Sequence, residues 1–220
     1  MFSWVTITSL GNVTNMAVAA AAIAVSMIAH RAWRIALWWC LLLLASTLLV
    51  VATKIAFIGW GVGIAPLDFK GFSGHSMRAS AIIPVIFYLG LIDRPRNIRI
   101  AGLVVGIALS VIVLISRLVL HFHSASEAVA GGLLGLMVSF SIICMLRSAP
   151  RFRFARPFIA FSLAALLIAP QTKPAPTQRW LVELTDYLAE HRTRLDTEVG
   201  GASLRFDRAI VKTHALGQLR

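Results

Sequence analysis

Ionisable side chains recur at the ends of two apolar runs in this sequence. Arg117, His123 and Glu127 follow one run, and His75 precedes another. Charged and ionisable groups are costly near hydrocarbon, so their presence there usually marks function. Two histidines, a carboxylate and an arginine together are suited to transferring or hydrolysing a phosphate.

The spacing of these residues indicates how they could act together. His123 and Glu127 are four residues apart, so on a helix they share a face and can hydrogen-bond. A carboxylate on one ring nitrogen fixes the tautomer and leaves the other nitrogen free to attack. Arg117 offers a rigid fork that suits phosphate oxygens. His75 lies in a different link and would approach from the opposite side.

The composition indicates that a membrane helix bundle positions these residues. Of 220 residues, 58% are hydrophobic and 14% are charged, and the mean hydropathy is +0.81. A soluble domain carries about 25% charged residues. The two cysteines, Cys40 and Cys144, lie inside apolar runs and suggest no disulfide or zinc framework.

The apolar runs predict an all-α, polytopic membrane bundle of about six transmembrane helices. Five predicted spans cover roughly 13–29, 35–53, 76–92, 100–120 and 128–146, and a marginal sixth covers 157–169. The sixth is short enough to be re-entrant or interfacial. We expect residues 1–170 to form this domain, and residues 171–220 to form a polar tail with an amphipathic helix.

The basic residues predict the orientation. The links after the first, third and fifth spans carry two, three and four arginines, which places them in the cytoplasm by the positive-inside rule. The links with the histidines then face the periplasm, if the membrane is a bacterial inner membrane. The net charge of +12 is spread between the spans and does not indicate a nucleic-acid partner.

At these residues the chain resembles the type 2 phosphatidic acid phosphatase superfamily, which includes lipid phosphate phosphatases and undecaprenyl pyrophosphate phosphatases. The relevant signatures are SRxxxxxHxxxD and PSGH. Here the longer one reads Ser116-Arg117, five residues, His123, three residues and Glu127. The shorter one reads Phe72-Ser73-Gly74-His75. The resemblance covers roughly residues 54–127 by motif and the whole body by layout.

The resemblance implies a role for each residue. His123 would be the nucleophile and would form a phosphohistidine, Glu127 would orient it, and His75 would protonate the leaving oxygen. The groups that would hold the phosphate are Arg117, Lys54 and the amides around Ser73 and Gly74. This chemistry needs no metal and no cofactor, and the partners implied are a lipid phosphate substrate and the bilayer.

The first family signature, KxxxxxxRP, is incomplete here. Counting from Lys54, Gly61 and Val62 stand where the arginine and proline belong. Because they lie nearby in the sequence, Lys70 or Arg78 would substitute for the missing arginine. Loss of a phosphate clamp would mean low activity, a smaller head group or a lapsed enzyme.

Two other departures are smaller. Phe72 replaces the proline of PSGH, which alters the turn more than the chemistry. Glu127 keeps the charge of the family aspartate but is one methylene longer, so its reach to His123 must be adjusted.

Other interpretations remain open at this point. His121 and His123, with His75 or His30, could hold a metal or haem, although His30 lies on the opposite face and a cation beside a metal is unfavourable. Glu127 could serve only as a helix cap, because the residues from Ser124 onward form a capping-box pattern. A non-catalytic lipid-binding or scaffolding member of the family is the main alternative.

We expect an integral membrane phosphatase that removes phosphate, or splits pyrophosphate, from a lipid. The sequence does not identify the lipid, the oligomeric state or the side of the tail. His121 lies outside the signature, and we expect a supporting or structural role for it.

Overall fold

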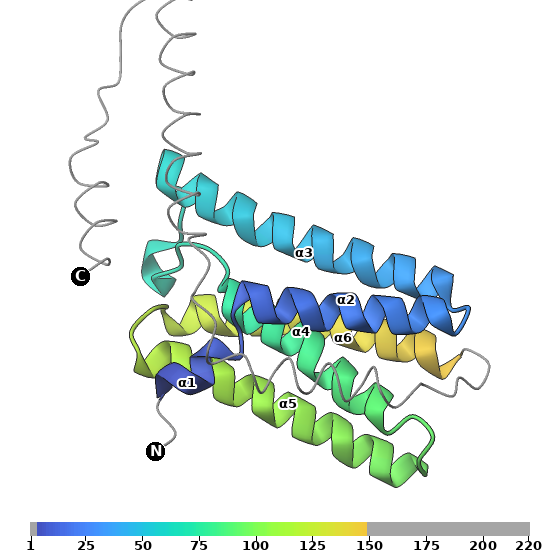
Figure 1. Ribbon diagram of the computed structural model, residues 1–220. Coiled ribbons are helices and arrows are strands. Elements are labelled where there is room, and N and C mark those ends of the chain that lie inside the picture. Colours follow the sequence, from blue (N-terminus) through green and yellow to red (C-terminus); the bar gives the residue numbers. More distant parts are fainter. Residues whose placement is uncertain (1–3, 149–220) are drawn as a thin grey trace, which may run out of the picture.

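The computed structural model describes residues 4–148, and this part of the chain is helical (Figure 1). The elements in chain order are α1 (Trp4–Ser9), α2 (Val13–Ala29), α3 (Trp33–Trp60), the short 3-10 helix η1 (Ala65–Leu67), α4 (Gly74–Gly90), α5 (Arg96–Val119) and α6 (Ala125–Arg147). The all-α expectation is confirmed for this part. The marginal sixth span and the polar tail lie outside the described residues.

Three helices, α3, α5 and α6, are long and apolar enough to cross a membrane, and α2 is a shorter apolar helix. Their outward side chains are large and apolar; Leu44, Val104 and Leu133 are each more than half exposed. Exposed surface of this kind is suited to hydrocarbon rather than to water. The protein is therefore an integral membrane protein.

Helix α4 has a different character from the span predicted at 76–92. Most of its residues are buried, and it packs mainly against α5 and α6. It carries His75, Arg78 and two serines, and it is not among the apolar candidates for crossing. Of the about six spans expected, the described residues therefore support three long apolar helices and one shorter one. Helix α4 forms the core of the bundle.

Small residues on α6 allow this core to pack closely. A Cβ added at Gly135 would overlap the carbonyl oxygen of Met77 on α4, and one at Gly131 would overlap that of Ser73. Small residues let membrane helices approach in this way. These two glycines therefore serve packing within the chain.

Helix α3 is longer than the apolar run 35–53 that predicted it. It continues through Lys54 to Trp60 and ends at Gly61, whose φ of 68° is left-handed. The residues after Lys54 are again apolar, so one lysine does not end the helix. The link between α3 and α4 consequently covers 61–73.

The bundle has two chemically different ends (Figure 1). One end holds α1, the end of α3, η1, the start of α4 and the turn between α5 and α6. The other end holds the links 30–32 and 91–95 and the end of α6, which carry arginines. All the links with predicted site residues therefore share one end.

Candidate functional site

The contact expected from the spacing of His123 and Glu127 is present. His123 Nδ1 lies 2.6 Å from Glu127 Oε2, and the two side chains are only 12% and 8% exposed. With the carboxylate at Nδ1, that nitrogen carries the proton and donates it, and Nε2 keeps its lone pair. The arrangement prepares Nε2 to act as a nucleophile.

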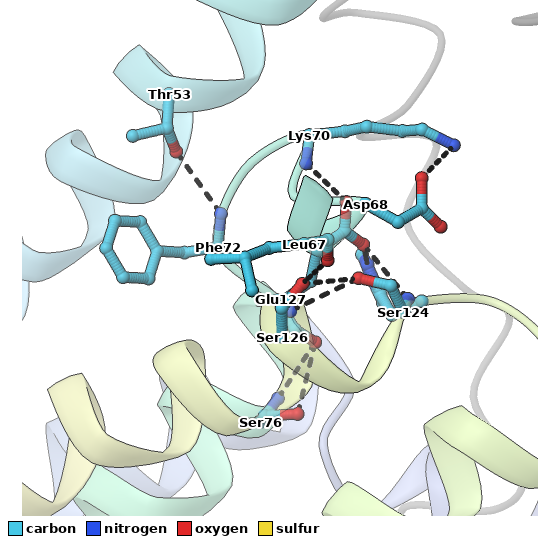
Figure 2. Close-up of polar contacts among 11 residues, drawn as sticks. Thr53, Leu67, Asp68, Lys70, Phe72, Ser76, Ser124, Ser126 and Glu127 are labelled. Atoms are coloured by element: carbon cyan, nitrogen blue, oxygen red, sulfur yellow. Dashed lines mark hydrogen bonds and ion pairs between the residues drawn. The ribbon is translucent and has the colours of Figure 1, made fainter. Parts of the chain in front are cut away.

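Glu127 is held by the backbone as well (Figure 2). Its Oε1 accepts a hydrogen bond from the Lys70 amide at 2.9 Å, and Oε2 accepts one from the Ser124 amide at 3.4 Å. Its own amide donates to Ser124 Oγ at 3.3 Å, which completes a capping box at the start of α6. Glu127 therefore caps the helix and orients His123 at the same time.

The turn between α5 and α6 is built on His121. This residue has a φ of 54°, its N–H donates to Leu118 O at 3.0 Å, and the N–H of Phe122 donates to Arg117 O at 3.1 Å. Such a pair of bonds around a left-handed residue ends a helix. Residue His121 itself is exposed.

Arg117 is buried at the end of α5, and two contacts fix its guanidinium. Its Nη1 donates to Thr8 Oγ1 at 3.0 Å, and Cζ lies 4.4 Å from the centre of the Phe122 ring. An arginine over an aromatic face gains cation–π energy. Its Nε is buried and has no partner among residues 4–148. That N–H is available to an anionic ligand.

The start of α4 is tied to the start of α6. The amide of Ser73 donates to the carbonyl oxygen of Glu127 at 3.1 Å, and Ser73 Oγ accepts from the Ser76 amide at 3.5 Å. The predicted phosphate donor at Ser73 is therefore already engaged. The amide of Gly74 lies in the first turn of α4, where helix N–H groups lack intrahelical acceptors, and it can meet an anion.

The departure at Phe72 has a structural reason. Its amide donates to Thr53 Oγ1 on α3 at 3.3 Å, a bond that proline could not make (Figure 2). Next to it, Gly71 has a φ of 134° and passes against the backbone and side chain of Lys54. Only glycine adopts this conformation readily, so the link can lie closely on α3.

The predicted cations act on His75. Burial is the largest cause that lowers the pKa of His75, and the charges of Arg117, Arg78, His123 and Lys54 lower it further, to about 2. Lys54 in turn interacts with the charges of Glu127, Arg78 and Arg117. Helices α3, α4 and α5 each contribute one cation of this cluster, namely Lys54, Arg78 and Arg117. Such a cluster attracts a multiply charged anion.

The structure separates the two predicted substitutes for the missing arginine. Arg78 lies one turn below Gly74, and its Nη1 would be 3.0 Å from a Cβ added there. Its Nε is buried without a partner in the described chain. The ammonium of Lys70 instead pairs with Asp68 at 3.1 Å, on a half-exposed loop (Figure 2). Arg78 belongs to the cluster, and Lys70 contributes only its backbone.

The environment lowers the pKa of His123. Burial is the largest cause, and the hydrogen bond that His123 donates to Glu127 opposes it by raising the pKa; the positive charges of Lys54 and Arg117 lower it further. The result is a neutral imidazole near pH 7. A neutral ring is the form that can attack phosphorus.

Sequence reasoning missed the contribution of the first residues. Thr8 bonds to Arg117, and a Cβ at Gly11 would lie 3.3 Å from His75 Cβ. The available signal was polarity, because the opening segment holds several polar residues, and Thr8, Asn12 and Asn15 among them are buried. Among residues 4–148, no three His, Cys, Asp or Glu side chains are grouped as a metal site would require.

Comparison with known proteins identifies the family. The model of the PAP2 superfamily matches residues 59–151, a range that includes both histidines and begins after Lys54. A relative from Klebsiella pneumoniae, an "Uncharacterized 22.5 kDa protein in cps region", is 36% identical over 149 residues, which is 67% of this chain and 71% of the relative. No solved structure matches the chain. Members of the superfamily are typically metal-independent phosphatases. The chain belongs to the PAP2 superfamily.

Proposed function

We propose that the protein hydrolyses a phosphate monoester or diphosphate of a lipid through a phosphohistidine on His123. The observation that carries the proposal is the 2.6 Å contact between His123 Nδ1 and Glu127 Oε2. It leaves Nε2 unprotonated beside three cations. A non-catalytic anion site would need Glu127 only as the cap of α6, and would gain nothing from its contact with His123.

The reaction would proceed in two steps. His123 Nε2 attacks phosphorus, the bond from phosphorus to the lipid oxygen breaks, and His75 gives that oxygen a proton. Water then attacks the phosphohistidine, His75 takes a proton from the water, and the bond between phosphorus and Nε2 breaks. Inorganic phosphate leaves in either case. When the substrate is a diphosphate, the bond that breaks in the first step joins the terminal phosphorus to the bridging oxygen, and the other product is a lipid monophosphate. Both histidines return to their starting state.

Arg117, Arg78 and Lys54 would hold the transferred phosphoryl group. The buried Nε atoms of the two arginines lack partners in residues 4–148, and oxygens of a phosphate would satisfy them. Burial is the largest cause of the low pKa of His75, and the neighbouring positive charges add to it. A bound phosphate would offset those charges and so raise the pKa toward the protonated form that the first step needs. Arg78 thereby takes over the role of the arginine missing from the first signature.

A lipid is the substrate class that the architecture favours. The cluster lies at one end of a bundle whose sides are apolar, where a head group can enter while its acyl chains stay in hydrocarbon. We place this end at the periplasmic face of a bacterial inner membrane, because the arginine-bearing links lie at the opposite end.

The test is phosphate release by the purified protein in detergent, with a panel of lipid phosphates and diphosphates and with a chelator present. His123→Ala should lose activity by at least about a thousandfold. The matched control is His121→Asn, which removes an exposed imidazole two residues away and keeps a residue that tolerates the left-handed conformation.

Trapping adds a direct readout. Wild-type protein quenched during turnover of a radiolabelled substrate should carry acid-labile label on His123. Release of phosphate without such label, or equal losses in His121→Asn and His123→Ala, would contradict the mechanism. A folded protein that releases nothing from any substrate would instead indicate a lapsed member that binds lipid.

A further inference from the structure

A second basic cluster lies at the end of the bundle away from His123. A cavity of about 250 Å³ is lined there by Tyr88, Arg96, Arg99, Ile100 and Arg147. The end of α4, the start of α5 and the end of α6 build it. Because α5 has 24 residues at about 1.5 Å each, roughly 36 Å separate this cavity from the turn that follows α5.

The three arginines of this cavity have no acidic partner in the described chain. The ion pairs within residues 4–148 are Lys70 with Asp68 and His123 with Glu127. The Nε of Arg99 is buried and makes no hydrogen bond there. A buried N–H without a partner is costly. An anion in the cavity would remove that cost.

The polarity of α5 strengthens the argument. Arg96 and Arg99 occupy its first turn, where the helix dipole is positive and a cation is unfavourable. The N-cap is Pro95, which supplies no side-chain cap, and the first turn has no acidic residue. Arg147 is different, because a cation in the last turn of α6 is favourable. The dipole of α5 therefore disfavours the positive charges of Arg96 and Arg99, and a bound anion would compensate for this unfavourable interaction.

The wall of the cavity indicates that the anion carries a hydrocarbon chain. Ile100 lines the cavity and is 42% exposed. Val104, Val111 and Ile115 follow it at helical spacing and are also exposed. They form an apolar strip that leads from the cavity along the outer face of α5. A free phosphate would use only the arginines, whereas a phospholipid would use both features.

We propose that this cavity binds the head group of an anionic phospholipid, with its phosphodiester on Arg99 and Arg147 and an acyl chain along the α5 strip. The head group belongs to the leaflet opposite the His123 cluster, which the positive-inside rule assigns to the cytoplasm. The lipid is a bound ligand there, and no reaction at this end is implied.

The experiment measures binding of phosphatidylglycerol, a phosphodiester, to the full chain in nanodiscs of phosphatidylcholine or in detergent. Native mass spectrometry should show retained phosphatidylglycerol, and a titration should give a dissociation constant. Arg99→Gln combined with Arg147→Gln should weaken binding by about tenfold or more. Arg147→Gln alone, at an exposed position, provides a second variant that should fold without difficulty.

The matched control is Arg94→Gln, which removes the same charge from an exposed residue of the link between α4 and α5 that does not line the cavity. It should bind within about twofold of wild type. Equal weakening by Arg94→Gln would show general attraction to a basic surface and would overturn the proposal. Glycerol phosphate at the same concentration should not displace the lipid. If it does, the strip contributes nothing and a lipid is not the ligand.

Discussion

At the scale of single residues, the site depends on a carboxylate with three tasks. Glu127 orients His123, accepts the amide of Lys70 and caps α6. An aspartate, as in the family signature, would have to reach the same three donors with one methylene less. Both interpretations of Glu127, as helix cap and as partner of histidine, were open from the sequence. The structure satisfies both, because Oε2 accepts from His123 Nδ1 and from the Ser124 amide.

The first prediction concerns pH. The pKa of His123 lies below its usual 6.5, so activity should persist below pH 6.5 until His123 becomes protonated. Lys54→Gln removes a charge that lowers this pKa. The acid limb of kcat/KM should therefore move to higher pH, together with a loss of activity from the weakened clamp. A pH profile of phosphate release measures both effects, and an acid limb that stays in place would contradict this electrostatic account.

The second prediction distinguishes the two substitutes for the missing arginine. Arg78→Gln should lower kcat/KM by about a hundredfold or more, because a buried fork is lost from the phosphate clamp. Lys70→Gln should change it by less than about threefold, since its ammonium pairs with Asp68 on the loop. Steady-state kinetics of phosphate release by the two variants shows which residue belongs to the phosphate clamp. The reverse order of effects would assign the clamp to Lys70.

At the scale of elements, hydropathy predicted which segments are helical but not what each helix does. The apolar runs correspond to α2, α3, α5 and α6. Helix α4 also appeared as a span, because its apolar residues resemble those of a lipid-facing helix, yet it is buried among its neighbours. Packing between helices decides whether a helix faces lipid or is buried in the bundle, and hydropathy carries no information about that packing. Helix α1 was missed, since six residues give no periodicity.

The third prediction concerns the contact between α4 and α6. Gly135→Ala should destabilise the bundle by about 1–3 kcal/mol, because the new methyl group would overlap the Met77 carbonyl oxygen. Gly59→Ala is the control, since nothing lies within 4 Å of a Cβ there. Thermal unfolding in detergent should show a lower Tm for the first variant alone. Equal Tm values would mean that the two helices can separate at no cost.

At the scale of the whole molecule, the placement of the site was the most predictable feature. Alternation of spans put both signatures at one end of the bundle, and the structure does the same (Figure 1). The position of Arg78 follows once α4 is known to begin at Gly74, because a residue four positions later lies on the same face. The contact of Thr8 with Arg117 could not be predicted, since no local pattern couples residues so distant in the chain.

The fourth prediction tests the orientation in the membrane. In a variant whose Cys40 and Cys144 are replaced by serine, Asp68→Cys should react with a membrane-impermeant maleimide in intact cells. Arg94→Cys should react only after the inner membrane is permeabilised, because it lies at the other end of the bundle. Both side chains are exposed. The opposite labelling pattern would invert the proposed topology.

The bond between Thr8 and Arg117 also has a consequence for biosynthesis. The two residues are 109 positions apart, so a ribosome adding about 5–20 residues per second makes Thr8 roughly 5–20 s before its partner. Helices α1 and α2 are therefore made before α5, and the guanidinium of Arg117 can bond to Thr8 only after α5 has been synthesised. An affinity tag fused before α1 would lie close to Thr8 and therefore close to this late-forming contact. A tag at the other terminus would not be attached to α1.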